Sequence, residues 1–180
     1  MLDYMFLKII SVLLMVKFSC VSCSNLTSGC NYKAAKKYVR LPNTVEEKLY
    51  VRKVFDGINS FRISRELAPL KRDEEIERLA EIHNVCMISR VKPHKGLKIS
   101  HRNSFDRFLI LEDKGYISYG ENTAAVRGHQ EEQNVLKFVN GWITSPDHYR
   151  NIVGDFTHSG VAITIDRRDE TIYGTQIFTK

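Results

Sequence analysis

The chain has 180 residues, with 27 Lys and Arg against 21 Asp and Glu, which gives a formal net charge of +6. Hydrophobic residues make up 43% and charged residues 27%, an ordinary globular composition that excludes a disordered chain, a collagen-like repeat and an integral membrane protein. The length suits one domain with a hydrophobic core, and four cysteines are too few for a disulfide-built miniprotein.

Residues 1–22 are predicted to be an export signal. Their uncharged apolar stretch, residues 9–16, is too short to span a bilayer, which takes roughly 20 residues. The segment ends in Cys20-Val21-Ser22-Cys23, which resembles a relaxed bacterial lipobox with Cys23 as the lipidated residue. We therefore expect a lipoprotein of the cell envelope, at the outer membrane or the cell surface. Plain secretion and an uncleaved anchor are the alternatives.

Residues 23–43 are polar and basic, which is typical of a tether between an anchor and a domain. The tether contains Cys30, and Cys86 follows 56 residues later. An oxidising compartment permits a bridge between them. We favour a small buried thiol at Cys86, because this residue falls on an apolar helix face.

The folded domain is expected to cover residues 44–180 and to open with two helices. Thr44 and Glu47 have the spacing of a capping box. Apolar residues then recur at helical spacing, at Val51, Val54, Phe55, Ile58 and Phe61. After Pro69, a second helix is predicted to bury one face, formed by Ile76, Leu79, Ala80, His83, Cys86 and Met87.

The rest of the chain predicts further helices and then a hairpin. A short helix around Phe105 ends near Gly115, Gly120-Glu121-Asn122 is interpreted as a turn, and a longer helix carries Val135, Phe138, Val139 and Trp142. Ser145-Pro146 starts another helix. Residues 159–165 and 171–178 are predicted to pair as antiparallel strands. This order indicates an α+β fold with helices covering a small antiparallel sheet.

The catalytic motifs with the clearest sequence signatures are missing. The sequence has no phosphate-binding loop, no G-x-S-x-G elbow and no H-E-x-x-H helix. Six histidines are present, and spacing alone does not make any of them a metal set.

Eight short motifs nevertheless occur in a specific order. They are Ile58-Asn59-Ser60-Phe61-Arg62, Leu67-Ala68-Pro69-Leu70, Ala80-x-x-His83, Ser100-His101, Gly115-Tyr116, Gly120-Glu121-Asn122, Trp142-x-x-Ser145-Pro146-x-His148-x-x-Asn151-Ile152 and Phe156-Thr157-His158-x-Gly160-Val161-Ala162. From about Val51 to Phe178 the chain thus resembles the bacterial branch of the CAP superfamily (cysteine-rich secretory proteins, antigen 5 and pathogenesis-related 1; also called SCP). The resemblance implies a three-layer α-β-α sandwich.

The resemblance also implies a cleft lined by two histidines and two acidic residues. Three of these positions match His101, Glu121 and His148, while the second acid of many eukaryotic members falls on Ser145. Two imidazoles and one carboxylate are the ligands of an open zinc site with water in the fourth position. A divalent cation such as zinc is therefore a possible cofactor, and without it Glu121 would orient one of the histidines.

Three functions remain open. The first is a binding protein without catalysis, which holds a lipid, a glycan or a host ligand in or near the cleft. The second is a divalent-metal-dependent hydrolase that uses His101, Glu121 and His148, with the metal activating water. The third is a host-interaction surface protein with a vestigial cleft. Ser145 at the position of the second acid favours the binding protein over an enzyme.

Other residues of these motifs are predicted to be structural. His83 lies on an apolar helix face, Trp142 belongs to the core, and Arg107 resembles a family arginine that braces the cleft loops. Gly120 is expected to supply a tight turn, and Asn122 to tie loops together. His158 is expected to be structural, and His129 to lie at a solvated helix start.

Residues 90–102 contain five basic side chains and no acidic one: Arg90, Lys92, Lys95, Lys98 and Arg102. Such a run is usually a solvated loop. Because it includes His101, it could also guide an anionic partner to the cleft, such as a phospholipid headgroup, a sulfated glycan or lipopolysaccharide. Nucleic acid is not expected, because the protein is predicted to be exported and the run has no aromatic residues for base stacking.

Overall fold

The computed structural model describes residues 44–90, 99–127 and 131–180, without the side chains of residues 131 and 132. The predicted signal, the tether with Cys23, His129 and three of the five basic residues (Lys92, Lys95 and Lys98) lie outside this range. The helices are α3 (Val45–Ser64), α4 (Glu74–Ser89), α5 (Ser104–Glu112), α6 (Glu131–Thr144) and α7 (Pro146–Ile152), and the strands are β1 (Lys71–Arg72), β2 (Gly120–Arg127), β3 (His158–Asp166) and β4 (Thr171–Thr179).

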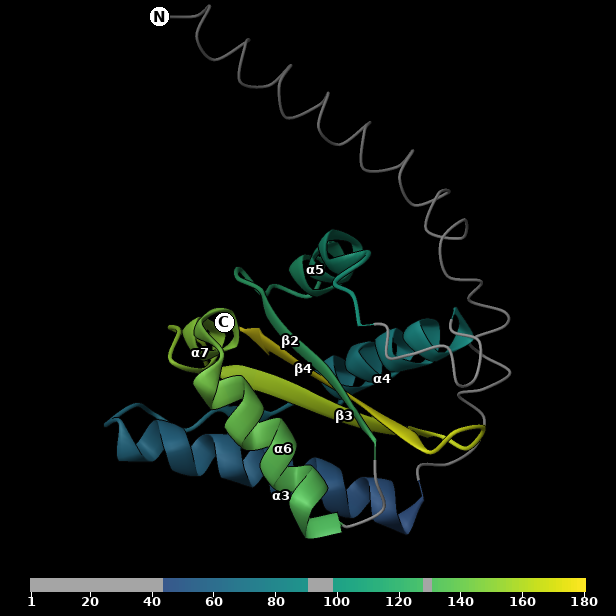
Figure 1. Cartoon of the computed structure of the whole chain (residues 1–180). Coiled ribbons are helices and arrows are strands. Elements are labelled where there is room, and N and C mark those ends of the chain that lie inside the picture. Colours follow the sequence, from purple (N-terminus) through teal and green to yellow (C-terminus); the bar gives the residue numbers. More distant parts are fainter. Residues whose placement is uncertain (1–43, 91–98, 128–130) are drawn as a thin grey trace, which may run out of the picture.

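The strands form one sheet in the order β1-β3-β4-β2. The predicted hairpin of β3 and β4 is confirmed, β2 pairs antiparallel with the other side of β4, and β1 runs parallel to β3. Helices α3 and α6 cover one face of the sheet, and α4 lies against β3 and β4 on the other (Figure 1).

Alternation along the central strands divides the core between the two faces. Val161 and Ile163 of β3 join the cluster under α3 and α6, while Ala162 between them joins the cluster under α4. Successive side chains of a strand point to opposite faces, so a strand buried on both sides carries an apolar residue at each position. The predicted three-layer α-β-α sandwich is confirmed.

The first helix starts where the capping box predicts. Thr44 Oγ1 accepts a hydrogen bond from the backbone N–H of Glu47 (3.1 Å), and Glu47 Oε2 accepts one from that of Thr44 (2.8 Å). The other oxygen of Glu47 accepts a bond from the backbone N–H of Ile165 in β3 (2.9 Å). The capping residue thus also joins the start of α3 to the sheet.

The interpretation of Gly120-Glu121-Asn122 as a turn is wrong. These residues begin β2, which pairs with β4 over its full length, and tertiary pairing outweighs the local turn preference of Gly and Asn. Gly120 is needed for space, because a Cβ atom there would lie 2.9 Å from Asn151 Oδ1 and 3.0 Å from Phe156 Cζ. Its small size lets α7 and the loop after it approach the strand closely.

The expectation of a free thiol at Cys86 is also wrong. Cys86 is buried, as its helix face predicts, but it is disulfide-bonded. The other three cysteines of the chain, Cys20, Cys23 and Cys30, all lie outside the described residues. Burial alone does not distinguish a thiol from half of a disulfide, because both are small and apolar.

A buried arginine of α3 fixes the chain around α7. Arg62 donates hydrogen bonds to the carbonyl oxygens of Ala68 (2.9 Å), Ile152 (2.7 Å), Gly154 (3.1 Å) and Phe156 (3.3 Å). These bonds satisfy the guanidinium with backbone acceptors and hold the end of α7 against α3.

None of the helices in the described ranges is long and apolar enough to cross a membrane.

Candidate functional site

The centre of the site is the buried carboxylate of Glu121 in β2. Arg107 of α5 donates from Nε to Oε2 and from Nη2 to Oε1, both at 2.8 Å. The Tyr119 hydroxyl donates to Oε2, and His101 Nδ1 lies 2.9 Å from Oε1. Three side chains therefore engage both oxygens of this carboxylate.

These partners keep Glu121 ionised. Burial acts to raise its pKa, but the hydrogen bond from His101 and the charge of Arg107 outweigh burial and hold the pKa at about 2. A carboxyl group with this pKa carries no proton to donate near neutral pH. It acts instead as a fixed negative charge that orients His101.

His83 of α4 lies on the inner side of the same cluster. Its Nε2 is 2.7 Å from the Ser100 carbonyl oxygen and 3.7 Å from Glu121 Oε1. Burial and then the charge of Arg107 lower its pKa to about 4, so the ring is neutral at pH 7 and its Nε2–H donates to Ser100. This is the core histidine that the helix periodicity predicts. Its proximity to Glu121 was not predicted.

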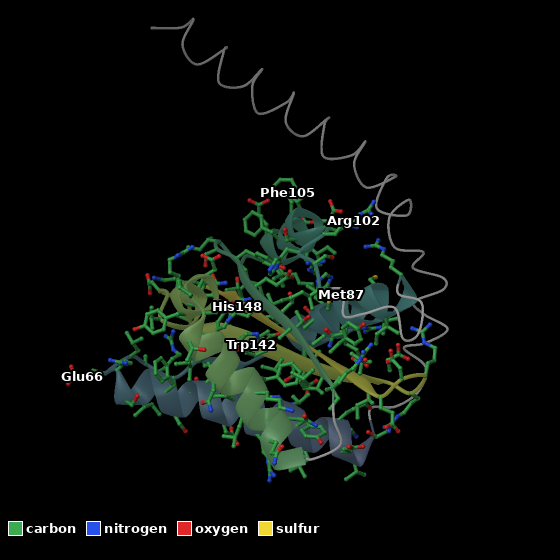
Figure 2. All side chains as sticks on the ribbon, viewed as in Figure 1. Glu66, Met87, Arg102, Phe105, Trp142 and His148 are labelled. Atoms are coloured by element: carbon green, nitrogen blue, oxygen red, sulfur yellow. The ribbon has the colours of Figure 1, made fainter. Side chains whose placement is uncertain are left out.

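His148 lies near the start of α7 (Figure 2), and its backbone carbonyl accepts a hydrogen bond from Asn122, the residue after Glu121. Burial and then the electrostatic influence of His101 lower the pKa of His148. The Nδ1 atom of His148 is buried and has no hydrogen-bond partner in the described part of the chain. His101, by contrast, is exposed.

Two asparagines connect α7 to β2. Asn122 donates from Nδ2 to the His148 carbonyl oxygen (3.2 Å). Asn151 donates to the Glu121 carbonyl oxygen (3.1 Å) and to Asn122 Oδ1 (2.8 Å). Asn122 thus joins separate segments, as expected, and Asn151 is a positioning residue that the sequence reasoning missed. Its place in the Asn151-Ile152 motif was the available signal.

Arg107 braces the cleft in the predicted way. Besides its contacts with Glu121, its Nη1 donates to the Arg102 carbonyl oxygen (3.0 Å), which ties the segment carrying His101 to α5. Ser145 is the N-cap residue of α7, and its side chain makes no capping hydrogen bond. Trp142 is almost fully buried, as expected of a core residue. His158 lies against the ring of Tyr116.

The three predicted metal ligands differ in their availability. Glu121 is held by Arg107 and Tyr119, so it does not fit the role of a direct ligand without giving up these contacts. His101 uses Nδ1 toward Glu121 and leaves Nε2 for another partner. Within residues 44–90, 99–127 and 131–180, no group of three or more His, Cys, Asp or Glu side chains could hold a metal ion. The three-residue zinc site stays a prediction.

Two residues of the basic run can be placed. Arg90 and Arg102 are exposed, and neither guanidinium has a hydrogen bond or ion pair with a side chain of the described residues. Partial burial and then the charge of Arg102 lower the pKa of Arg90, so the two cations act on each other. Arg102, the residue after His101, adds positive charge beside it.

Residues 55–178, more than half of the chain, match the sequence model of the cysteine-rich secretory protein family, CAP. The chain belongs to this family. The match covers most of the range over which the ordered motifs resemble the CAP superfamily. No curated protein matches the chain significantly.

Solved bacterial structures share this CAP fold. An outer surface protein of Borrelia burgdorferi is 18% identical, with a TM-score of 0.56, and the match covers 74% of this chain and 93% of that one. A cysteine-rich secretory protein of Staphylococcus aureus is 15% identical (TM-score 0.57), with 76% of this chain and 40% of that one covered. An extracellular SCP-domain protein of Bacillus anthracis is 23% identical (TM-score 0.51), with coverages of 77% and 44%. The chain thus spans less than half the length of the last two.

Proposed function

We propose that the protein is an exported, envelope-anchored CAP-domain binding protein without catalytic activity, which recognises an anionic group at the cleft of His101 and His148. The group is a phosphate or sulfate ester, carried by a lipid headgroup or by a glycan. The observation that carries the proposal is the engagement of both Glu121 oxygens by Arg107, Tyr119 and His101. The one acid that matches the cleft has no free lone pair directed at a substrate.

The side chains that remain available as donors are those of two arginines. Arg102 and Arg90 are exposed and have no acidic partner in the described ranges. Arginine is well suited to phosphate and sulfate groups, because its planar guanidinium presents paired N–H donors. Catalysis by a general base needs an unengaged carboxylate or imidazole within reach of the substrate. Glu121 is engaged, and the free Nε2 atom of His101 is the group on which the second candidate depends.

Export is supported by the similar bacterial proteins, which are described as outer surface, secretory or extracellular. Cleavage before Cys23 and lipidation of this residue are the finer part of the proposal. They would leave the tether of residues 23–43 between the membrane and a CAP domain over residues 44–180.

Binding of two soluble probes tests the proposal, sn-glycerol 3-phosphate for a headgroup and a sulfated heparin tetrasaccharide for a glycan. NMR of the histidine rings follows each titration. We expect saturable shifts of His101 and His148 with at least one probe, and about fivefold weaker binding in Arg102→Gln, as for the loss of one cationic contact. Arg150→Gln, an exposed arginine paired with Asp147 on α7, is the matched control. Absence of saturation with both probes, or equal loss in the control, would contradict the proposal.

A second candidate is a metal site of two histidines. The bond between His101 Nδ1 and Glu121 is of the kind that metal-binding histidines make with a carboxylate, because it fixes the tautomer of the ring and leaves Nε2 for the ion. His101 and His148 would then hold zinc, which supplies an activated water when bound. Zinc titration by calorimetry compares wild type with the His101→Ala, His148→Ala double variant. Equal, weak binding in both would end this candidate and the hydrolase with it.

A further inference from the structure

Exposed apolar side chains are frequent in the segment of the chain that contains α5. Six large hydrophobic residues of the described ranges are exposed, and three of them fall within residues 99–117: Ile99 (50%), Phe105 (66%) and Ile117 (76%). Figure 2 shows Phe105 on α5, and Arg102 lies two residues before the start of this helix at Ser104. We use the name α5 face for Phe105 on α5 together with Ile99, Arg102 and Ile117 in the segments that flank this helix.

The α5 face adjoins an open pocket of about 370 Å³, lined by Ser104, Phe105, Phe108, Ser118 and Tyr119. Its rings form a row, with centroids 6.4 Å apart from Phe105 to Phe108 and 6.2 Å apart from Phe108 to Tyr119. Tyr119 at the inner end binds Glu121. The row therefore leads from the exposed ring of Phe105 to Tyr119, the hydrogen-bond partner of the buried Glu121.

Keeping an apolar surface of this kind in water is unfavourable, and a concentrated patch usually marks an interaction site. The pocket lining carries no charge, while Arg102, two residues before Ser104, adds a cation at the same end of α5. A partner must therefore offer apolar groups to Phe105 and anionic groups to Arg102. An anionic lipid surface provides both, because acyl chains lie directly beneath charged headgroups.

The chain outside the described residues favours this partner. Thr44 follows Cys23, the predicted lipidation site, by 21 residues, a contour length of about 70 Å at most. A domain on such a tether stays close to the membrane, so even a weak contact with lipid is populated through the high effective concentration.

We propose that the α5 face docks on an anionic lipid surface, with Phe105 and Ile117 in the interfacial region and Arg102 at the headgroups. This assignment rests on the lipid anchor of the proposed function and goes beyond it, because it gives a partner to the α5 face and does not need an occupied cleft. Arg102 is the one residue that serves both proposals.

Vesicle co-sedimentation tests the docking. The mature chain, residues 23–180, carries Cys23→Ser so that no lipid anchor contributes. Vesicles consist of phosphatidylcholine with or without phosphatidylglycerol. We expect binding only to the phosphatidylglycerol vesicles, weakened by salt, about tenfold weaker in Phe105→Ser because of the lost apolar burial, and about fivefold weaker in Arg102→Gln.

Two variants serve as matched controls, Ile63→Ser on α3 and Leu136→Ser on α6, because both residues are exposed apolar side chains far in sequence from α5. They should change binding less than twofold. Three results would each overturn the docking. They are vesicle binding of Phe105→Ser as strong as that of wild type, an equal loss of binding in the two controls, and no binding of the unsubstituted chain to either kind of vesicle.

The cleft proposal can be judged separately in the same samples. Phe105→Ser should keep the wild-type response to sn-glycerol 3-phosphate and the wild-type urea midpoint. Loss of vesicle binding in the His101→Ala, His148→Ala variant with full binding by Phe105→Ser would overturn the α5 face and support the cleft. The opposite pattern would support the α5 face alone.

Discussion

Removing the cation that neutralises Glu121 should strongly destabilise the domain. In Arg107→Met the aliphatic part of the side chain is kept, while the four hydrogen bonds of the guanidinium, to Glu121 twice, to Tyr119 and to the Arg102 carbonyl, are lost. Glu121 then keeps only Tyr119 and the exposed His101 as close partners. Both members of the Arg107–Glu121 pair are buried.

The expected loss of unfolding free energy is about 3–5 kcal/mol at pH 7, the range for breaking a buried ion pair from one side. Most of this loss reflects the uncompensated charge of Glu121. The double variant Arg107→Met, Glu121→Leu removes this charge as well and should recover most of the loss, because an apolar replacement of a buried pair is often nearly neutral.

Urea unfolding at pH 7, followed by circular dichroism, gives the four free energies of this double-mutant cycle. The pH dependence adds a second check. Without Arg107 the pKa of Glu121 rises from about 2, so the folded variant takes up a proton at a higher pH than wild type and its deficit shrinks as the pH falls. A deficit of less than about 1 kcal/mol, or a double variant as unstable as the sum of the two single ones, would refute the reasoning.

Three further predictions concern other parts of the molecule. The pKa of His83 is about 4 in the folded state, against an ordinary value of 6.5. Between these pH values the unfolded state binds one more proton than the folded state, so the unfolding free energy should fall by about 3 kcal/mol as the pH falls from 6.5 to 4. Urea midpoints measured over this range should change much less with pH in His83→Gln. Gly160→Ala should destabilise the domain by more than about 2 kcal/mol, because the new Cβ would clash with the backbone of Ile76 and Glu77. Gly141→Ala in α6 places its Cβ in open space and should stabilise the domain by about 0.5–1 kcal/mol. Thermal unfolding measures both changes. If Cys20 is removed with the signal and Cys23 is lipidated, Cys30 is the remaining partner for the disulfide of Cys86. A peptide map without reduction should then contain a Cys30–Cys86 cross-link. An unpaired Cys30 thiol would contradict this assignment.

The helices and the final hairpin could be predicted because their signals are local. Thr44 and Glu47 mark the start of α3 through bonds that they make with each other. Val135, Phe138 and Trp142 indicate one face of α6, and all three are buried. In each case the residues that carry the pattern also make the contacts.

β2 could not be predicted, because its pairing partner β4 lies about 50 residues later in the chain. Gly120 and Asn122 favour turns locally, and the space that Gly120 leaves is filled by Asn151 and Phe156, which are distant in sequence. Strands whose ladder is non-local give little local signal when small and polar residues interrupt the alternation.

The residues of the candidate site were predicted from the sequence, but the contacts among them were predicted only in part. The order of motifs identified His101, Glu121 and His148, but it did not show that Arg107 and Tyr119 occupy the Glu121 carboxylate. This occupation depends on where α5 packs, which the sequence of α5 does not encode by itself. It changes the expected role of Glu121 from a metal ligand to the partner that orients His101.

The carbonyl contacts of Arg62 also limit how this part of the chain can vary in length. One rigid guanidinium donates hydrogen bonds to the carbonyl oxygens of Ile152, Gly154 and Phe156 together. An added or deleted residue between positions 152 and 156 would therefore move at least one of these acceptors out of reach. Insertions and deletions in related sequences should therefore avoid this short stretch.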